Sequence, residues 1–479
     1  MIGKHLLPAS ETEKQNEYIK KVRAWNDRHA EETGKRRRAY VLTLGCQQNE
    51  ADSEKIAGML CAMGYEMTRD ENEASFLAVN TCAVREHAEK RALSFIGQYK
   101  HLKAKDPEVI IAVFGCMVAQ EHRAEAIKKS NPYVDLVFGT SSLYRLPELL
   151  LDHLERGKRL FCTGETEYTV AEGIPVRRES TYRAWVSVMY GCDNFCSYCI
   201  VPYVRGRERS REKSEIIKEV RELVNAGYRD ITLLGQNVNS YGRTDGFPYD
   251  FADLLEELDR IEGDYLIRFM TSHPKDASHK LIDVMATSKH IAHQFHLPLQ
   301  SGSDRLLRVM NRHYDLAKYF DSLDYIKDKM PDCALSTDII VGFPGETEED
   351  FSATLAALGR ARYDMIFSFL YSPRKGTPAA EMEDQIPEAV KSERYGRMLK
   401  LQNAISLEKN QPLVGKTVRI LSDGISKNND EVCSGRTEGN KIVFYHGTGS
   451  DAGKWLFVKI DRAEAFALYG EVVPDGETV

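Results

Sequence analysis

The sequence contains no long hydrophobic run. Its longest apolar stretches, such as Val109–Phe114, are far too short to span a bilayer. The first residues soon become polar and charged, without the apolar segment of a secretory signal. We therefore expect a cytoplasmic protein that has no membrane partner.

The sequence also has no excess of positive charge. Its 65 Lys and Arg residues are outnumbered by 72 Asp and Glu residues, which gives a net charge of −7. Binding of nucleic acid through bulk positive charge is therefore not expected. A local basic stripe can still supply phosphate contacts, so any RNA site must be local.

A disulfide framework is not expected either. The ten cysteines are spread over 479 residues, and no export signal is visible. In that setting, clustered cysteines are better explained as metal ligands or catalytic thiols.

The length is too great for one hydrophobic core, so several domains are expected. Residues 1–38 form a charged extension that ends in the basic run Lys35–Arg38. We expect this extension to be helical or disordered, and contact between its basic end and RNA is the alternative. The rest of the chain is predicted to contain an α/β domain at 39–155, a linker at 156–180, a barrel core at 181–410 and a small β domain at 411–479.

The α/β domain is predicted from apolar runs that alternate with helix-like stretches. Tyr40–Leu44, Phe76–Val79 and Val109–Phe114 are β-branched or aromatic-rich, and Leu136–Phe138 adds a further strand. Alternation of this kind predicts a Rossmann-like domain with a parallel sheet.

The barrel core is predicted from a second alternating series. Its expected strands are Trp185–Tyr190, Ile231–Leu234, Leu266–Met270, Gln294–Leu297, Leu335–Val341 and Ile366–Tyr371. Five helical segments lie between them, one of which is Asp304–Lys329, and together they predict a partial (β/α)6 barrel. The tail, Pro412–Val473, is β-like with glycine-punctuated turns and predicts a small all-β barrel.

The strongest local signal is a CxxxCxxC segment directly after the first barrel strand. Cys192, Cys196 and Cys199 have the spacing that suits a [4Fe–4S] cluster with one iron left free of protein ligands. A structural zinc site and chance spacing are the alternatives. Zinc usually needs a fourth Cys or His nearby, and none follows Cys199 in the same loop.

A second cysteine set is spread out in sequence. Cys46, Cys82 and Cys116 each follow the end of a predicted strand by one to three residues. Because the carboxyl ends of parallel strands meet at one edge of a sheet, these thiols are expected to converge and to hold a second cluster. Buried free cysteines are the alternative. The remaining cysteines are given no role: Cys61, Cys162, Cys333 and Cys433.

With both sets in view, the chain from about residue 40 to 473 resembles the methylthiotransferase family of radical S-adenosylmethionine (SAM) enzymes. The segments that carry the resemblance are Thr43–Gln47, Asn80–Arg85, Gly115–Met117 and Cys192–Gly206. The tail, including Ser434–Glu438, resembles the TRAM domain, an RNA-binding barrel. The first 38 residues lie outside the resemblance.

Within the family, four more stretches look most like the members that modify N(6)-dimethylallyladenosine in the anticodon loop of tRNA. They are Leu234–Asn239, Thr271–Pro274, Leu297–Asp304 and Val341–Glu346. This resemblance implies two [4Fe–4S] clusters, two SAM molecules per turnover and an electron donor protein. A sister activity on threonylcarbamoyl-adenosine of tRNA, or on an aspartate of a ribosomal protein, is the nearest alternative.

The resemblance also implies roles for the two cysteine sets. The cluster on Cys192, Cys196 and Cys199 would reduce SAM to a radical that removes hydrogen from carbon 2 of the adenine. The cluster on Cys46, Cys82 and Cys116 would hold the sulfur, which a second SAM methylates before transfer. An iron–sulfur RNA-binding protein that senses redox state is the alternative without catalysis. Nothing points to an oligomer, so a monomer is expected.

SAM contacts are expected from the strand ends of the barrel, where ligands of this fold bind. Tyr198 lies inside the cluster loop and is a candidate to cover the adenine. The other candidates follow strands two, three and four: Gly235, Gln236, Asn237, Ser272, His273 and Gln300. The alternative for each polar residue is an ordinary loop hydrogen bond or helix cap.

RNA contacts are expected from basic residues at alternate positions after the cluster loop. In an extended segment, one side would present Arg205, Arg207, Arg209, Arg211 and Lys213 to phosphates. A solvated face is the alternative, since Glu208 and Glu212 interrupt the run. Four residues of the tail domain are similar candidates: Lys416, Arg419, Arg436 and Lys441.

Overall fold

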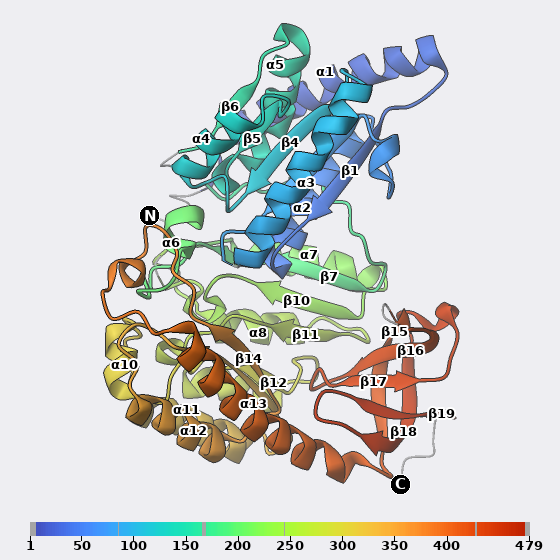
Figure 1. The fold of residues 1–479 in the computed structure, drawn as a ribbon. Helices are drawn as coiled ribbons and strands as arrows, with labels where there is room; N and C mark the ends of the chain where they lie inside the picture. Colours follow the sequence, from blue (N-terminus) through green and yellow to red (C-terminus); the bar gives the residue numbers. More distant parts are fainter. Residues whose placement is uncertain (1–5, 85, 165–168, 244, 427–428, 475–479) are drawn as a thin grey trace.

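Three units follow one another along the chain: a parallel sheet between helices, a partial barrel and a closed β-barrel (Figure 1). The computed structural model describes residues 6–84, 86–164, 169–243, 245–426 and 429–474. Arg85, the last residue of the second cysteine motif, lies outside the described residues. Among the helices described, none has the length and apolar character needed to cross a membrane.

The amino-terminal unit contains a six-stranded sheet in which all strands are parallel. In spatial order its strands are β2 (Glu66–Met67), β1 (Arg38–Thr43), β3 (Phe76–Thr81), β4 (Ile110–Gly115), β5 (Leu136–Phe138) and β6 (Leu160–Cys162). Successive side chains of β3 enter different hydrophobic clusters, Phe76 and Ala78 on one face, Leu77 and Val79 on the other. Burial of both faces explains why these strands are continuously apolar in the sequence.

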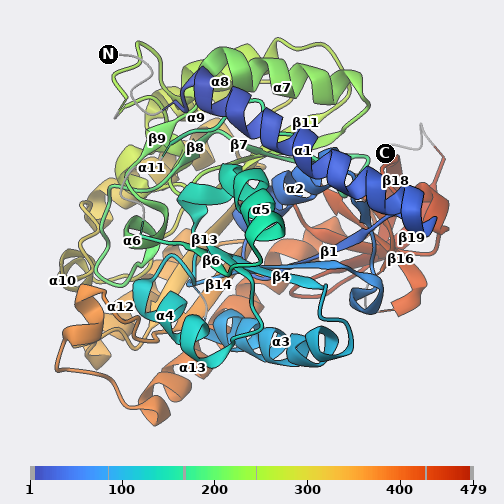
Figure 2. The same cartoon turned by 90° about the horizontal axis from the view of Figure 1, so that it is seen from above.

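Helices cover both faces of this sheet (Figure 2). On one side lie α1 (Ala9–Thr33), α2 (Gln47–Ala62) and α5 (Leu146–Arg156), and on the other lie α3 (Glu86–Lys105) and α4 (Glu121–Ser130). The predicted Rossmann-like arrangement is confirmed.

One segment bears out a sequence expectation and another differs from it: the charged extension is helical, as one of its two predicted forms, and the predicted linker contains a strand. Helix α1, in the predicted charged extension, packs on α5 and α2 and buries Val22 completely. Strand β6 lies inside the range predicted as a linker, yet it pairs with β5 and extends the sheet. A three-residue strand carries too little periodicity to be recognised before its partner strand is known.

The central unit contains six parallel strands arranged as a partial barrel. The strands are β7 (Arg183–Ser187), β10 (Asp230–Leu234), β11 (Leu266–Phe269), β12 (Gln294–His296), β13 (Ala334–Val341) and β14 (Met365–Leu370). They form two three-stranded sheets, β11-β10-β7 and β12-β13-β14, which a parallel bridge between Ile267 and Ile291 joins. The outer helices are α7 (Lys213–Asn225), α8 (Phe251–Asp259), α9 (His279–Thr287), α10 (Asp304–Val309), α11 (Leu316–Lys329) and α12 (Glu348–Ala361).

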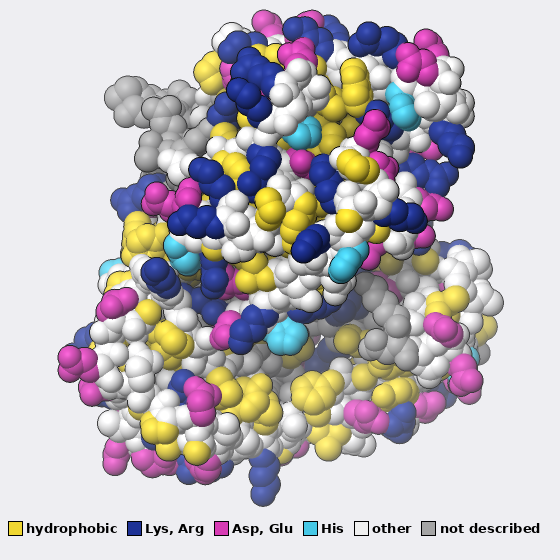
Figure 3. Space-filling view, turned by 45° about the horizontal axis from the view of Figure 1, so that its top comes forward, with side chains coloured by type: hydrophobic (Ala, Val, Ile, Leu, Met, Phe, Trp, Pro, Cys, Tyr) yellow, Lys and Arg dark blue, Asp and Glu magenta, His cyan; other side chains and the backbone are white. Residues whose placement is uncertain are grey.

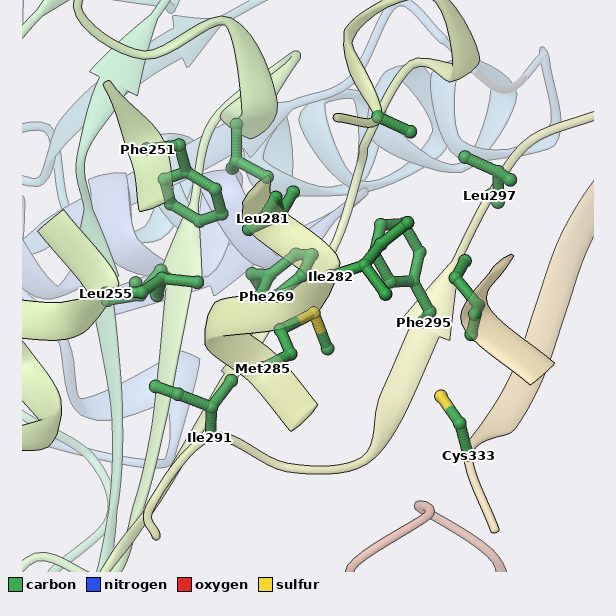
Figure 4. Packing of buried hydrophobic residues seen from close by; sticks show 14 of the residues in the cluster. Phe251, Leu255, Phe269, Leu281, Ile282, Met285, Ile291, Phe295, Leu297 and Cys333 are labelled. Atoms are coloured by element: carbon green, nitrogen blue, oxygen red, sulfur yellow. The ribbon is translucent and has the colours of Figure 1, made fainter. Parts of the chain in front are cut away.

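One large hydrophobic core joins these strands to their helices (Figure 4). The rings of Phe251 and Phe269 meet edge to face at 5.2 Å, and those of Phe269 and Phe295 at 5.5 Å. Cys333 belongs to the same core, as expected for a cysteine without a ligand role.

Two predicted elements of the core are interrupted. The expected helix Asp304–Lys329 is divided into α10 and α11, with Asn311 and His313 in left-handed conformations between them. The expected strand Trp185–Tyr190 is divided into β7 and the short β8 (Met189–Tyr190), which pairs with β9 (Arg209–Ser210). Both interruptions adjoin the cluster loop, whose start at Gly191 follows β8 directly.

The amino-terminal unit lies against both ends of the open barrel. At the β7 end, Gln48 Nε2 donates to Ser187 Oγ at 3.0 Å. Beyond β14, Ser372 Oγ donates to Glu86 at 2.8 Å, and Arg374 Nη2 donates to the Val84 carbonyl at 3.2 Å. These contacts place the cysteine edge of the amino-terminal sheet against the carboxyl edge of the barrel strands.

The last unit is a closed barrel that α13 (Glu388–Asn410) connects to the core. Around the barrel the strands follow the order β15 (Thr417–Ser426), β16 (Asn429–Thr437), β17 (Ile442–Tyr445), β19 (Leu468–Val473) and β18 (Trp455–Ala463). It docks at the amino ends of the core strands, where Arg268 donates to the Thr437 carbonyl at 3.0 Å and Arg183 pairs with Asp423 at 2.9 Å. The barrel therefore lies at the strand edge opposite the cluster loop.

Candidate active site

Cys46, Cys82 and Cys116 converge at the carboxyl edge of the amino-terminal sheet, and we call them the sheet-edge cysteines. A Cβ atom built on Gly45 would lie 2.8 Å from Cys82 Cβ and 3.1 Å from Cys82 Sγ, so the first cysteine loop touches the second. Gly115, which precedes Cys116, is equally confined, with Thr81 backbone atoms within 3 Å of such a Cβ. Both glycines have positive φ angles, so a side chain at either position is excluded sterically and conformationally.

Asn49 holds the sheet-edge cysteines together. Its Nδ2 donates to the carbonyls of Leu44 (2.7 Å) and Thr81 (3.1 Å), which precede Cys46 and Cys82. Its Oδ1 lies 3.8 Å from Cys46 Sγ and 4.0 Å from Cys116 Sγ. Asn49 lies in the first turn of α2, whose N-cap is Cys46, so the positive end of a helix dipole points toward these sulfur atoms.

Burial dominates the electrostatics of this edge. It raises the pKa of Cys116 to about 12, and the neighbouring Arg205 guanidinium opposes the rise. Metal binding must therefore displace a proton from this thiol, as it does at other cysteine sites.

The second set, Cys192, Cys196 and Cys199, lies in the loop after β8, and we call these the loop cysteines. Gly191 starts the loop with a positive φ, and a Cβ there would lie 2.0 Å from the Arg207 carbonyl oxygen. Its N–H donates to Gln236 Oε1 at 2.5 Å, which ties the loop to the end of β10.

The segment between α10 and α11 supports the same loop from the other side. Asn311 Nδ2 donates to the Phe195 carbonyl at 2.9 Å, and Arg312 Nη1 donates to Cys196 Sγ at 3.3 Å and to the Tyr198 hydroxyl at 3.4 Å. Asn194 Nδ2 donates to Cys192 Sγ at 3.4 Å. The break in the predicted helix thus brings Arg312 to the cluster loop.

N–H groups point at several of the six sulfurs, as they do at metal-bound thiolates. Thiolates accept hydrogen bonds, and N–H groups point at Cys82 (from Val84 N, 3.3 Å), Cys192 and Cys196. Cys46 and Cys116 instead donate toward Asn49 Oδ1, as Cys333 in the core donates to a carbonyl, and Cys162, which has no ligand role, accepts from Arg145 at 3.2 Å. No three His, Cys, Asp or Glu side chains in the described part of the chain could hold a single metal ion. An iron–sulfur cluster is larger than one ion and spaces its ligands farther apart.

The two cysteine sets are connected through α6 (Val201–Arg205), which follows the loop cysteines directly. Ile200 and Val204 pack with Ala83 and Cys116 in one small hydrophobic cluster. Thr140 Oγ1 donates to the Val204 carbonyl at 2.6 Å from the amino-terminal unit. The segment that follows the loop cysteines thus packs against Cys116 of the sheet-edge set.

The predicted SAM residues all lie at the carboxyl edge of the barrel, but several have structural partners. Gly235 packs against Met189, with no room for a Cβ, and Ser272 Oγ donates to the His296 carbonyl. Gln300 has a positive φ, and its backbone pairs with β13. Tyr198 is half-buried beside the α10 core, and burial raises its pKa well above the ordinary value.

Two side chains at this edge have buried atoms without a hydrogen-bond partner. Asn237 donates to Asp276 at 2.9 Å, but its Oδ1 has no donor. His273 accepts from the Lys275 N–H at 3.2 Å, and its Nε2 is unpartnered. Burial, with Arg312 nearby, lowers the pKa of His273 well below 6.5, so the ring is neutral. Because Nδ1 of the neutral ring accepts, Nε2 carries the hydrogen, so this edge offers a ligand one free acceptor, Asn237 Oδ1, and one free donor, His273 Nε2–H.

Comparison with known proteins covers the whole chain. Residues 186–358 match the radical SAM superfamily, 38–139 match the uncharacterized protein family UPF0004, and 411–473 match the TRAM domain. The tRNA-2-methylthio-N(6)-dimethylallyladenosine synthase of Acetivibrio thermocellus is 48% identical over 463 residues, 97% of this chain and 96% of the relative. This chain belongs to that synthase family.

Other relatives match nearly the whole chain. The synthase of Alkaliphilus oremlandii is 47% identical over 473 residues, 99% of each chain, and that of Clostridioides difficile is 45% identical over 468 residues, 98% of each chain. The amino-terminal 38 residues, which the motifs left outside the resemblance, are therefore part of the synthase family's alignment.

Solved structures support the fold of this synthase-family chain. The radical SAM methyltransferase TsrM from Kitasatospora setae, with cobalamin and a [4Fe–4S] cluster bound, has a TM-score of 0.53 at 14% identity. The match covers 72% of this chain and 74% of that one. The cobalamin-dependent radical enzyme OxsB has a TM-score of 0.50 at 13% identity, over 78% of this chain and 56% of its own. At these identities the likeness concerns the fold alone.

The predicted basic stripe of this synthase-family chain is wrong for three of its five residues. Arg205, Arg209 and Arg211 are buried, because Arg205 ends α6 and the segment of Arg209 and Arg211 is extended but pairs with β8 as β9. Arg211 pairs with Glu172 and Glu219, each at 2.7 Å. Buried, paired guanidinium groups cannot meet phosphates.

The other basic candidates differ in exposure. Arg207 is 68% exposed, and Lys213 pairs loosely with Glu257 at 3.8 Å. On the barrel, Lys416 is exposed and Arg419 stacks on Trp455 at 4.1 Å. Arg436 and Lys441 instead lie at the interface with the core, beside Asp423 and Asp364. Figure 3 shows Lys and Arg interspersed with Asp and Glu on the face in view.

The basic run at the end of the extension is also paired. Arg36 lies 3.4 Å from Asp27, Arg37 lies 3.8 Å from Glu108, and Arg38 pairs with Glu73 at 2.5 Å. This run stands at the start of β1, at the strand end away from the sheet-edge cysteines.

Sequence reasoning missed Asn49, Asp52 and Arg312, and it gave Arg205 another role. Asn49 and Asp52 could have been found from their position in the first turns of a helix that begins at a candidate ligand. The role of Arg205 at the sheet edge, and that of Arg312, which lies 116 residues from Cys196 in sequence, had no local signal. An aromatic pair was also missed: Tyr203, 45% exposed, meets Phe195 edge to face at 5.8 Å, and Arg207 lies over Phe195.

Proposed function

We propose that this chain is a radical SAM methylthiotransferase that converts N(6)-dimethylallyladenosine in the anticodon loop of tRNA to its 2-methylthio derivative. The observation that carries the proposal is the convergence of two cysteine sets on α6, in a chain similar over its full length to such synthases. An acid–base site would need no second set of thiols.

The loop cysteines would hold one [4Fe–4S] cluster, to which SAM binds, and the sheet-edge cysteines would hold another. When bound, these groups supply the electron and sulfur chemistry that no side chain can provide at an adenine C–H bond. An electron donor protein would feed them, and the chain would act as a monomer in the cytoplasm.

The chain's own residues would position these groups. Arg312 and Asn194 donate to the loop sulfurs, and donors of this kind tune iron–sulfur clusters. Asn237 Oδ1 would accept a hydrogen bond from an amino or hydroxyl group of SAM, and the Nε2–H of the neutral His273 would donate one to an oxygen of SAM. Tyr198, Gly235, Gln236, Ser272 and Gln300 would shape that site through the packing described above.

RNA would be held by the exposed members of the predicted set. Tyr203 offers an aromatic face beside the cluster loop, and Arg207, Lys213, Lys416 and Arg419 offer positive charge. Because the target base lies in a single-stranded loop, it can leave the stack at small cost and enter the site.

The test compares wild type with Cys82→Ala and with the Cys192/Cys196/Cys199→Ala variant, all reconstituted without oxygen. We expect about eight irons in wild type and about four in the triple variant. Cys82→Ala should still release 5′-deoxyadenosine from SAM and should fail to methylthiolate tRNA. Full methylthiolation by Cys82→Ala would contradict the proposal.

A sister activity would share the six cysteines, so iron counting does not separate it. Mass spectrometry of tRNA from a deletion strain does. Loss of the 2-methylthio group from dimethylallyl-adenosine supports the proposal, and its loss only from threonylcarbamoyl-adenosine contradicts it.

A further inference from the structure

We propose that Arg205 is a positioning residue for the sheet-edge cysteines. In this role it carries positive charge from the radical SAM segment into the neighbouring cluster site. The proposal rests on the second cluster of the proposed function. It replaces the phosphate contact that the sequence suggested for this residue.

The contacts of Arg205 fix it from both units. Its Nη2 donates to Asn49 Oδ1 and to Asp52 Oδ2, each at 2.8 Å, and its side chain is only 6% exposed. Asp52 Oδ1 in turn accepts from Gln48 Nε2 at 3.1 Å, and the same Gln48 nitrogen donates to Ser187 at the end of β7. One polar chain thus runs from the barrel to the guanidinium.

The same contacts place the charge against the thiols. Asn49 Oδ1, which accepts from Arg205, lies within 4.0 Å of both Cys46 Sγ and Cys116 Sγ. Arg205 is also the last residue of α6, and Val204 of α6 and the N-cap residue Ile200 belong to one hydrophobic cluster with Cys116. A structural change at the loop cysteines can therefore reach the Arg205 guanidinium, beside the sheet-edge cysteines, through the short segment that joins them.

Burial of this ion pair calls for a functional explanation. Removing two charges from water costs more than their attraction usually returns, so an apolar pair would pack here at lower cost. A cluster on three thiolates, of which those of Cys82 and Cys116 are buried, is anionic, and a nearby cation stabilises it. It stabilises the reduced, more negative state most, and it therefore raises the reduction potential of the cluster.

Arg211 provides a matched control. It lies six positions further along the same segment, it is also buried, and it also has carboxylate partners. Those partners, Glu172 and Glu219, are not cysteine neighbours. Arg211→Gln should cost stability, as Arg205→Gln does, without acting on the sheet-edge sulfurs.

The experiment uses the full chain with Cys192/Cys196/Cys199→Ala, so that only the sheet-edge cluster remains. Iron content, the electron paramagnetic resonance spectrum of the reduced cluster and its reduction potential are measured in this parent. The same measurements are made after adding Arg205→Gln, Arg205→Lys or Arg211→Gln, and the thermal midpoint of each protein is recorded.

We expect Arg205→Gln to shift the potential to more negative values and to change the spectrum, and Arg205→Lys to restore most of the potential. Arg211→Gln should leave both at the parent values. Loss of iron from Arg205→Gln, but not from Arg211→Gln at a similar thermal midpoint, would equally support positioning.

An unchanged potential and spectrum in iron-loaded Arg205→Gln would overturn the inference and leave the proposed function intact. Equal loss of iron from both variants would also overturn it, since general instability would then explain the loss. A parent without iron would remove the second cluster, and with it both proposals.

Discussion

Gly58 in α2 gives the sharpest test of how the amino-terminal unit is fixed to the barrel. A Cβ atom at this position would lie 2.2 Å from the Pro175 carbonyl oxygen and 2.7 Å from the Val176 nitrogen. Both atoms belong to the backbone of the connecting segment, which also donates from the Arg177 N–H to the Glu54 carbonyl at 3.0 Å. The connector therefore lies directly on this helix.

Two effects of Gly58→Ala oppose each other. Replacing glycine by alanine inside a helix stabilises it by about 1 kcal/mol. Against this, Pro175 would have to withdraw by about 1 Å to restore ordinary contact, and overpacking of this kind costs about 1–3 kcal/mol. Because backbone atoms rather than a flexible side chain must move, we take the upper end, which leaves a net loss of about 2 kcal/mol.

The position of the connector makes that displacement costly. Arg178 follows it and pairs with Glu54 at 2.8 Å and with Glu219 of α7 at 2.5 Å. Moving the connector would disturb both ion pairs and, with them, the contact between the two units.

The assay is thermal unfolding of Gly58→Ala beside Gly97→Ala. Gly97 is an exposed glycine of α3, and nothing lies within 4 Å of a Cβ atom built on it. Its substitution by alanine should therefore stabilise the helix without any opposing steric cost. We expect the first unfolding midpoint to fall by about 4–8 °C for Gly58→Ala and to rise by about 2–4 °C for Gly97→Ala. A rise for both variants would refute the reasoning.

Three further predictions concern the barrel and the RNA surface. Arg268→Ala should cost about 1–3 kcal/mol, because the Thr437 and Glu438 carbonyls lose their donor, while Asp230 keeps Arg183 as a partner. Limited proteolysis should then release the barrel, and an unchanged digestion pattern would contradict this. Burial raises the pKa of Asp364, but Lys441 and Lys409 outweigh it and hold the pKa below the ordinary 3.8. The stability this carboxylate contributes is therefore present above about pH 4 and lost at lower pH. Asp364→Asn should reduce this loss of unfolding free energy at low pH. An unchanged pH dependence of the unfolding free energy would argue against the assignment. Tyr203→Ala should weaken binding of an anticodon stem–loop RNA about tenfold. Arg207→Ala should reduce by about 1 the slope of the logarithm of the binding constant against the logarithm of the salt concentration. Unchanged affinity and slope would remove both residues from the RNA surface.

The sequence by itself determined the architecture and the six candidate ligands. Strand β3 is apolar on both faces, and each Gly-Cys or Thr-Cys step follows a strand, so the sheet edge could be placed without coordinates. The three cysteines of the CxxxCxxC segment lie in one short loop, so their spacing can be recognised without knowing which distant segments pack together. Periodicity likewise predicted the barrel strands to within a few residues, because alternation of buried strands and amphipathic helices is a short-range pattern.

The tertiary structure alone decided where the charges lie. Alternate basic residues suggested one exposed stripe, yet Arg205 and Arg211 meet carboxylates from segments far away in sequence. The break between α10 and α11 has no strong local breaker, and it serves to bring Arg312 to Cys196. Whether a guanidinium meets water, phosphate or a buried partner depends on which distant segment packs over it, and that is a property of the assembled fold.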